Sequence, residues 1–433
     1  MEFNINPNVI KAINLLENNG FETYLVGGSL RDLIMGYEIA DFDLSTSASL
    51  EDIFNTFKEY KVKKYSNSVN TVLLRINNTE IEITSFKGNT IVEDLSKRDF
   101  TVDAMAYSIL RGLYDPFGGE EDCKNHLLKT VGNPKDVFTY DPIRILRGIR
   151  FFETRELKPN QELIDEMNKY SFLLKDVSRE RFKDELNPIL LSETPSFYIR
   201  TFKDVFFTII PELKPCYKFD QRNTKWHHLD VLEHILHVLD ATKPDLVLRL
   251  SALFHDIGKP ESFSLDEFGV GHFYGHFKVS EEIAENVLTR LCYGSKIVNR
   301  VKKLVYYHDR RLENQTKQLR KFILEFGVDD IDLLFALKRA DIIGQNPALL
   351  DRIYDLDEIA NTCYNLIKEN KIITIKKLKI NGTDLINMGF IGSEIGKTLK
   401  TILDAVVDSK VENEREDLIR FVEIHKEELK NNN

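Results

Sequence analysis

Residues 25–44 read LVGGSLRDLIMGYEIADFDL, and this stretch decides how the beginning of the chain is interpreted. An apolar strand pattern runs into Gly27 and Gly28, and a short helical pattern follows and ends at Gly36. A strand that passes through two glycines into a helix exposes backbone N–H groups at the start of that helix, where they bind anions such as phosphate. The stretch therefore predicts a phosphate site in a strand–turn–helix–strand unit.

Two carboxylates, Asp41 and Asp43, stand at the end of the same stretch. Because alternate residues of a strand point to one face, we expect these side chains to lie side by side. Carboxylate oxygens are the ligands that Mg²⁺ prefers, and two such ions can activate a hydroxyl and stabilise a triphosphate leaving group. An ordinary turn and an exposed strand are the structural alternatives for each piece alone. Their close succession favours a catalytic site.

The chain has 433 residues, of which 42% are hydrophobic and 30% charged, with a formal net charge of −10. This composition predicts a globular protein of several domains. No apolar run reaches the length of a membrane helix, no secretory pattern stands at the start, and the four cysteines lack metal-type spacing. We therefore expect a cytoplasmic protein with reduced thiols and no membrane contact.

The acidic net charge argues against RNA binding through bulk attraction to phosphate. Residues 290–321 nevertheless contain ten Lys and Arg against two acidic residues. This basic stretch is either a local RNA-binding surface or a solvated helical face, and the sequence favours neither.

Helix and strand patterns alternate up to residue 140, and long helical patterns dominate after it. A helix is expected from Pro7 to Gly20, and residues 72–76 with 80–84 predict a hairpin. The helices expected in the second part cover residues 143–151, 161–169, 179–186, 229–239, 280–291 and 330–340. We expect an α+β fold with domains at 1–140, 141–225, 226–345 and 346–433.

The opening stretch resembles the signature of the class II tRNA nucleotidyltransferases and their poly(A) polymerase relatives. The resemblance continues in the family's order with LSKRDFTVDAMAY (95–107), LYDPFGGEEDCKNHLLKTVGNP (113–134), YDPIRILRGIRF (140–151) and VSRERFKDEL (177–186). It implies a palm-like nucleotidyltransferase head on an all-α neck, with Mg²⁺ bound by Asp41 and Asp43. The implied nucleotide contacts are Gly28, Arg31, Arg98, Asp141, Arg144, Arg147 and Arg150.

The residues also suggest how a base is selected. Cytosine and adenine both present an amino donor beside a ring-nitrogen acceptor, so an Asp acceptor with an Arg donor can pair with either base and reject guanine and uracil. Asp141 and Arg144, three positions apart, are expected on one helix in these roles. Arg144, Arg147 and Arg150 recur every three positions and alternate with core residues rather than acidic partners, which favours a functional face over an exposed basic stripe.

The chain departs from the family pattern at three places. The family usually has Glu where this chain has Tyr140, and Asn where it has Asp103. Many members carry a long flexible loop between the segments that end at Phe86 and begin at Arg98, and here that loop is short. Members that add only two cytidines resemble this chain in lacking the loop, so addition of a terminal A stays open. Glu82 is either a third acidic group or part of a solvated strand face.

Eight of the ten histidines fall between His227 and His308. With two aspartates they form the order H…HD…H…H…D, which resembles the HD phosphohydrolase superfamily over residues 226–345. Imidazole and carboxylate ligands suit one or two divalent transition metals, whereas a lone buried histidine is usually a core residue. The candidate ligands are His234, His255, Asp256, His276, His308 and Asp341. The remaining histidines of the cluster, which are His227, His228, His237 and His272, are expected at the surface or in support of the ligands.

These patterns predict an enzyme that extends the 3′ end of tRNA with C and A from CTP and ATP, with a possible second phosphohydrolase activity. The alternatives are a poly(A) polymerase, and an HD-type phosphohydrolase with an inactive, RNA-binding head. Residues 377–399 resemble the C-terminal region of bacterial members of the tRNA family, which weighs against the poly(A) polymerase. The intact carboxylate pair weighs against an inactive head.

Overall fold

In the computed structural model, the strands of the head form a seven-stranded sheet of order β3-β4-β5-β2-β1-β6-β7. The pair β2–β5 is parallel and the other neighbouring pairs are antiparallel. The strands are β1 (Thr23–Val26), β2 (Phe42–Thr46), β3 (Lys61–Ser66), β4 (Val69–Ile76), β5 (Thr79–Ser85), β6 (Ala106–Ser108) and β7 (Gly112–Tyr114). The sequence analysis did not predict β3, β6 and β7.

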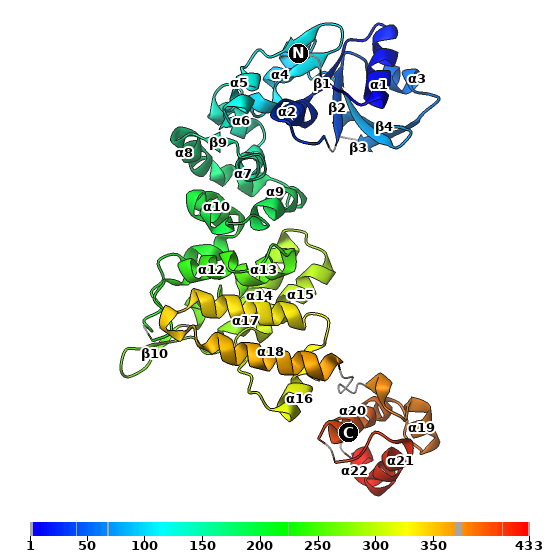
Figure 1. The fold of residues 1–433 in the computed structure, drawn as a ribbon, viewed down its shortest axis with the longest axis vertical. Coiled ribbons are helices and arrows are strands. Elements are labelled where there is room, and N and C mark those ends of the chain that lie inside the picture. The colour runs from blue at the N-terminus through cyan, green and yellow to red at the C-terminus, as the bar shows by residue number, and fades with distance from the viewer. Residues whose placement is uncertain are drawn as a thin grey trace. The chain divides into compact units, whose positions relative to one another are not determined.

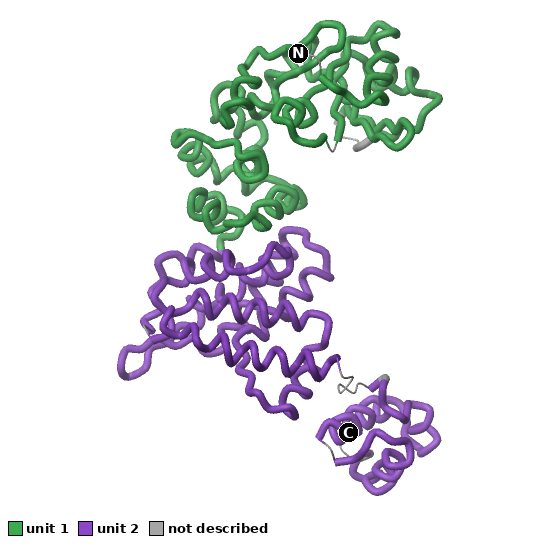
Figure 2. The backbone as a smooth tube through the Cα atoms, viewed as in Figure 1, with its two compact units in different colours: residues 1–211 green, residues 212–433 purple. Residues whose placement is uncertain are grey.

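The structure describes residues 3–39, 41–66, 69–223, 225–368, 375–408 and 410–431. The chain divides into two compact units, residues 1–211 and 212–433 (Figure 2). The mixed sheet followed by helices confirms the α+β class (Figure 1). The finer division into four domains stays a prediction.

Local sequence signals set the first helices of the head. Helix α1 (Pro7–Asn18) begins where the Asn6 side chain accepts the Asn8 N–H, with proline in the first turn. Helix α3 (Leu50–Thr56) begins with the expected capping box between Ser49 and Asp52. The further helices of the head are α4 (Ile91–Ser96), η1 (Thr101–Asp103), α5 (Gly119–Lys124) and α6 (Pro134–Tyr140).

Helix α2 (Gly27–Met35) follows β1 without a break and ends at Gly36, whose φ of 78° is left-handed. It lies beside β1, β2 and β6, whereas α1 packs on β1, β2 and β5 (Figure 1). The first turn of α2 therefore stands next to the strand that carries Asp43. This is the strand–turn–helix–strand unit that the sequence predicted.

The rest of the first unit is almost entirely helical. Helices α7 and α9 pack against each other and bury the apolar residues that alternate with the arginines of α7. The elements are β8 (Leu127–Leu128), α7 (Arg144–Thr154), β9 (Lys158–Pro159), α8 (Gln161–Lys169), η2 (Ser171–Asp176), α9 (Glu180–Leu190), α10 (Pro195–Thr201) and α11 (Lys203–Ile209), and η3 (Pro211–Cys216) spans the boundary between the two units. Helix α8 has the bounds that its apolar spacing predicted.

The second unit begins with a helical body in which α12 and α13 pack together and each packs against α17. Helix α18 lies along α17 (Figure 1). The elements of this body are α12 (Val231–Asp240), α13 (Leu246–Phe254), η4 (Pro260–Ser262), β10 (Ser264–Leu265), β11 (Gly271–His272), α14 (His276–Arg290), α15 (Ser295–Tyr307), α16 (Thr316–Phe326), α17 (Ile331–Gly344), η5 (Pro347–Leu349) and α18 (Arg352–Lys368).

The C-terminal helices build an apolar core of their own, centred on Leu385, Phe390, Ile402 and Leu418. The elements are η6 (Ile375–Lys377), α19 (Gly382–Asn387), α20 (Ser393–Val407), α21 (Arg415–Ile424) and α22 (Lys426–Asn431). Among the described residues, no helix is both long and apolar enough to span a membrane.

The basic stretch 290–321 forms ion pairs with acidic residues elsewhere in the second unit. Asp330 binds Arg300 and Lys303 at 2.7 and 2.9 Å, and Asp408 binds Lys317 and Lys321 at 3.2 and 2.7 Å. Glu212 binds Arg290, Glu325 binds Arg310, and Glu285 binds Lys302. Much of the local positive charge is therefore neutralised within the fold.

Candidate active site and candidate metal centre

The two predicted catalytic carboxylates lie at the start of β2. Asp43 is inside the strand, opposite Glu82 in the parallel register with β5, whereas Asp41 precedes the strand and is exposed. The Asp43 N–H donates to the Ser29 hydroxyl at 2.8 Å, which ties the first turn of α2 to the strand. The register thus brings Glu82, which the sequence left ambiguous, to the carboxylate strand.

The negative charge of Glu82 interacts unfavourably with both Asp41 and Asp43. Burial and the charge of Glu82 raise the pKa of Asp43 to about 6, although Arg98 and Arg147 act in the opposite direction. Burial and the charge of Asp41 also raise the pKa of Glu82. A partly buried group of like charges is relieved by a cation, and oxygen ligands suit a hard divalent ion. The residues present therefore fit a divalent metal.

The two glycines before α2 have different surroundings. Gly27 has a φ of +65°, and a Cβ there would lie 3.0 Å from Arg98 Nη1 and 3.3 Å from Asp43 Oδ2. A Cβ on Gly28, the residue expected at the nucleotide, would meet Arg31 Nη2 at 3.3 Å. Gly27 is thus the glycine that permits close approach to the carboxylate, whereas the expected nucleotide contacts included only Gly28 of the pair.

The predicted triphosphate arginines already have acidic partners. Arg31 is 4% exposed, and its guanidinium binds Asp32 at 2.8 Å and Asp103 at 2.7 Å. Arg98 binds Asp94 at 3.2 Å. Their roles at the nucleotide stay predictions. The structure places both guanidiniums in a charged network next to the carboxylate strand.

The arginines of α7 also have partners in the head and neck. Arg147 binds Asp99 at 2.8 Å and Asp103 at 2.9 Å, and Arg150 binds Glu185. The expectation that these arginines lack acidic partners is therefore wrong, because the partners come from distant segments of the chain. Arg144 donates to the Lys97 carbonyl at 2.6 Å and stacks over Tyr140, 4.9 Å from the ring centre.

Asp141 is not on the helix that carries Arg144. It stands between α6 and α7, and its carboxylate accepts two hydrogen bonds from Arg181 of α9, at 3.0 and 2.7 Å. The expected Asp141–Arg144 side-chain arrangement on one helix is thus incorrect, because α7 begins only at Arg144. Both side chains nevertheless lie at the junction of α6 and α7, and their roles in reading a base stay predictions.

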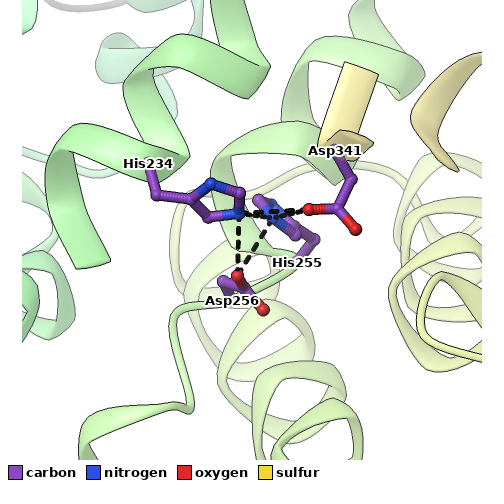
Figure 3. Close-up of side chains that lie close together, drawn as sticks. All are labelled: His234, His255, Asp256 and Asp341. Carbon is purple, nitrogen blue, oxygen red and sulfur yellow. Dashed lines mark hydrogen bonds and ion pairs between the residues drawn. The ribbon is translucent and has the colours of Figure 1, made fainter. Parts of the chain in front are cut away.

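The predicted histidine centre is assembled in the second unit. His234 and His255 point their Nε2 atoms at one another, 3.2 Å apart, and at Asp256 and Asp341 (Figure 3). His234 Nε2 lies 3.0 Å from Asp256 and 3.1 Å from Asp341. The four residues come from α12, the end of α13 and α17, so tertiary packing rather than local sequence brings them together.

A second group shares Asp256. Its other oxygen, Oδ1, lies 3.2 Å from His276 Nε2 and 3.6 Å from His308 Nε2. The ligand atoms of each group lie within 4.8 Å of one another. A carboxylate with one oxygen in each group has the arrangement of a bridging ligand between two metal ions, and the mixed N/O donors suit transition metals.

All four histidines are oriented by their other ring nitrogen. The Nδ1 atoms lie within 2.6–3.0 Å of the backbone carbonyls of Gly344, Ala252, Phe273 and Val305, respectively for His234, His255, His276 and His308. Donation from Nδ1 to a carbonyl leaves Nε2 as the atom that would bind a metal once it has lost its proton, as is typical of metal-binding histidines. Burial lowers the pKa of His234, but hydrogen bonds to Asp256 and Asp341 outweigh it and raise the value to about 9.

A cavity of about 800 Å³ opens onto this centre. Asp256, His276, His308 and Asp341 line it, whereas His234 and His255 are fully buried behind them. The sequence analysis missed Lys259, which binds Asp256 Oδ2 at 2.6 Å and lines the same cavity. Its position three residues after Asp256 on a short turn was the available signal.

Two further residues support the centre. Gln345 donates to both carboxylate oxygens of Asp341, at 3.1 and 3.0 Å, and Arg352 donates to Gln345. His227, for which no specific role was expected, lines the cavity, and its buried Nδ1 has no hydrogen-bond partner among the described residues. His272 also lines the cavity, and it pairs with Asp266 on the β10–β11 hairpin.

Comparison with known proteins gives matches to parts of both units. The family model of the poly(A) polymerase head domain matches residues 23–91 and 87–129, and that of tRNA nucleotidyltransferase domain 2 matches residues 271–422. A CC-adding tRNA nucleotidyltransferase of Shouchella clausii strain KSM-K16 is 36% identical over 180 residues, which are 42% of this chain and 47% of that protein. A CCA-adding enzyme of Staphylococcus aureus strain Newman is 26% identical over 438 residues, covering 95% of this chain and 96% of that protein.

The fold agrees with a solved structure. The Bacillus stearothermophilus CCA-adding enzyme in complex with CTP has a TM-score of 0.69 and 22% identity, covering 99% of this chain and 100% of that chain. The mixed sheet with its carboxylate strand defines a nucleotidyltransferase head. Matches over both units support a class II tRNA nucleotidyltransferase.

Proposed function

We propose that this protein adds C and A, without a nucleic-acid template, to the 3′ end of tRNA, using CTP and ATP. The observation that carries the proposal is the pairing of Asp43 with Glu82 beside Gly27, which leaves a carboxylate cluster open to a phosphate. The relatives named for CC and CCA addition support it.

The carboxylates would hold Mg²⁺. Bound there, the metal supplies activation of the primer hydroxyl and charge stabilisation at the phosphates. Asp41 and Asp43 would provide the oxygen ligands, and the N–H groups at the start of α2, where no side chain caps the helix, would face the phosphates. Arg31 and Arg98 neutralise the triphosphate and orient the sugar.

Asp141 and Arg144 select the base. The carboxylate accepts the amino group that cytosine and adenine share, and the guanidinium donates to the adjacent ring nitrogen. A guanine or uracil leaves these polar groups unpaired, which costs binding energy. Because Arg181 and Asp141 are partly exposed, their ion pair contributes little stability and is readily exchanged for a base.

The test is nucleotide incorporation into tRNA that ends at the discriminator base. The purified protein, Mg²⁺ and each labelled nucleoside triphosphate are combined separately, and then CTP and ATP together. Two C followed by one A is the expected product. Two C without A identifies a CC-adding enzyme, and repeated A alone identifies a poly(A) polymerase. Absence of C incorporation contradicts the proposal, and Asp43→Ala should abolish incorporation.

A second activity is favoured by one observation, the two groups of Nε2 and carboxylate atoms that share Asp256. We propose that this centre binds divalent transition metal ions and hydrolyses phosphate esters in the adjoining cavity, with Lys259 as a cation beside the phosphate. A phosphomonoester and a phosphodiester of p-nitrophenol test it, with Mn²⁺, Co²⁺, Ni²⁺ or Zn²⁺. His255→Ala should abolish hydrolysis and leave C incorporation, whereas Asp43→Ala should do the reverse. We further propose a cytoplasmic location, where tRNA and both nucleotides occur.

A further inference from the structure

Asp103 lies at the end of η1 and is 2% exposed. Its two carboxylate oxygens contact different arginines. Oδ1 accepts Arg31 Nη1 at 2.7 Å, and Oδ2 accepts Arg147 Nη2 at 2.9 Å. Its backbone carbonyl accepts Arg98 Nη1 at 3.3 Å. One buried residue therefore contacts three of the arginines expected at the nucleotide.

These arginines belong to three separate segments of the first unit. Arg31 is on α2, Arg98 follows α4, and Arg147 is on α7. Their other acidic partners differ, because Asp32 binds Arg31, Asp94 binds Arg98 and Asp99 binds Arg147. Asp103 is the shared partner among the described residues, so it fixes the distance between the arginines of α2 and α7.

The nearby positive charges keep Asp103 ionised. Burial raises the pKa of this carboxyl, but Arg31 and Arg147 outweigh burial and lower it. A buried carboxylate between two guanidiniums is held in one geometry, since each charge-assisted hydrogen bond has directional preferences. The guanidiniums are correspondingly restricted before a nucleotide binds.

We propose that Asp103 is a positioning residue for the incoming nucleotide, setting the triphosphate arginine Arg31 and the α7 arginine Arg147 in register with each other. The inference rests on the proposed nucleotidyltransferase function. Asp103 acts through arginines rather than through a base-specific contact. Loss of the Asp103 carboxylate should therefore weaken the binding of CTP and the binding of ATP by similar factors and leave tRNA binding unchanged.

Asp103→Asn tests this with minimal change in shape. It installs the residue that the family usually has at this position, so the test asks whether the Arg31–Asp103–Arg147 arrangement of this chain needs both carboxylate oxygens. An amide has one acceptor oxygen, so it can serve one guanidinium, and its NH₂ group faces the other. We expect the KM for both CTP and ATP to rise about tenfold, with a smaller change in kcat and an unchanged KM for tRNA.

Asp330→Asn is the matched control. Asp330 is 4% exposed and also binds two cations, Arg300 and Lys303, but it lies in the second unit and outside both candidate sites. The two variants should lose similar thermal stability, and only Asp103→Asn should raise the nucleotide KM. Equal kinetics of the two variants would overturn the inference, because the effect of Asp103 would then be stability alone.

Asp99→Asn keeps the inference testable if Asp103→Asn does not fold. Asp99 is 7% exposed and binds Arg147 without contacting Arg31 in the described structure. It should raise the KM for both nucleotides by a smaller factor than Asp103→Asn. No rise in either folded variant overturns the inference. Absence of incorporation by the wild-type protein instead overturns the proposed function, so the two failures are distinguishable.

Discussion

Asp43 lies directly opposite Glu82 across the parallel strands β2 and β5. The pairing places like charges on neighbouring strands, where they destabilise the metal-free sheet and favour a cation. Glu82 is thereby connected to the chemistry of Asp43 even if it never contacts a metal.

The metal affinity of the head should depend on pH through this pair. Because the pKa of Asp43 is raised to about 6, protons compete with Mg²⁺ below that value. We expect the affinity of the metal-free protein for Mg²⁺ to fall between pH 7.5 and 5.5. Glu82→Gln removes a negative neighbour, lowers the pKa of Asp43 and moves this fall to lower pH. Calorimetric titration at each pH measures the Mg²⁺ affinity. An identical pH midpoint in the wild type and in Glu82→Gln contradicts the coupling between Glu82 and Asp43.

The same shift has a consequence for folding without metal. A carboxyl whose pKa is higher in the folded than in the unfolded chain binds its proton more tightly when folded. Its contribution to stability therefore decreases as the pH rises from 3.8 to about 6. Chemical unfolding in EDTA should show a smaller decrease for Asp43→Asn than for the wild type over this range. If the unfolding free energy of Asp43→Asn and of the wild type depended equally on pH, groups other than Asp43 would determine that dependence.

Gly27→Ala should damage catalysis more than stability. Its Cβ would press on Arg98 and Asp43, whereas Gly36→Ala meets nothing within 4 Å at a similar φ of +78°. Both substitutions should cost about 1 kcal/mol of unfolding free energy, from the left-handed backbone. Only Gly27→Ala should slow single-turnover C addition, by tenfold or more. Similar rates for the two variants would mean that the close approach is unimportant.

The histidine centre should hold two transition metal ions per chain. His276→Ala should retain the inner ion and lose the one next to the cavity, since only the second group contains His276. His237→Ala is the control, because His237 is exposed and outside both groups. Elemental analysis after dialysis gives the metal content. One ion in the wild type contradicts the bridging arrangement of Asp256.

Removal of Asp141 should affect nucleotide choice. We expect Asp141→Ala to lower incorporation of C and A and to reduce discrimination against U. Arg181→Ala should change the free energy of unfolding by less than about 1 kcal/mol, because the ion pair is partly exposed. It should also leave discrimination intact. Competition between CTP and UTP measures the discrimination against U in both variants. Unchanged discrimination in Asp141→Ala would remove this residue from base selection.

Local patterns predicted local structure well. The proline that begins α1, the glycine that follows its end, the capping box of α3 and the apolar spacing of α8 each depend on a few consecutive residues. Strands β6 and β7 have three residues each, which is too short for a periodic pattern. Strand β6 joins the sheet by pairing with β1, which no local signal encodes, and β7 joins it by pairing with β6.

The candidate histidine and carboxylate ligands could be selected from the sequence because their residue types have few other uses in such an order. The partners of the arginines were not, because ion pairs such as Arg147–Asp103 and Arg150–Glu185 join residues far apart in sequence. The helix assigned to Asp141 was wrong because the turn between α6 and α7 ends one helix and begins another within four residues. Spacing alone cannot distinguish one long helix from two.

The contrast between the two ligand sets has a consequence for the cell. An oxygen-only cluster draws on magnesium, which is abundant, whereas imidazole nitrogens at Asp256 draw on scarce transition metals. If both proposals hold, removal of transition metals would abolish phosphate-ester hydrolysis in the second unit and leave magnesium-dependent C incorporation unchanged.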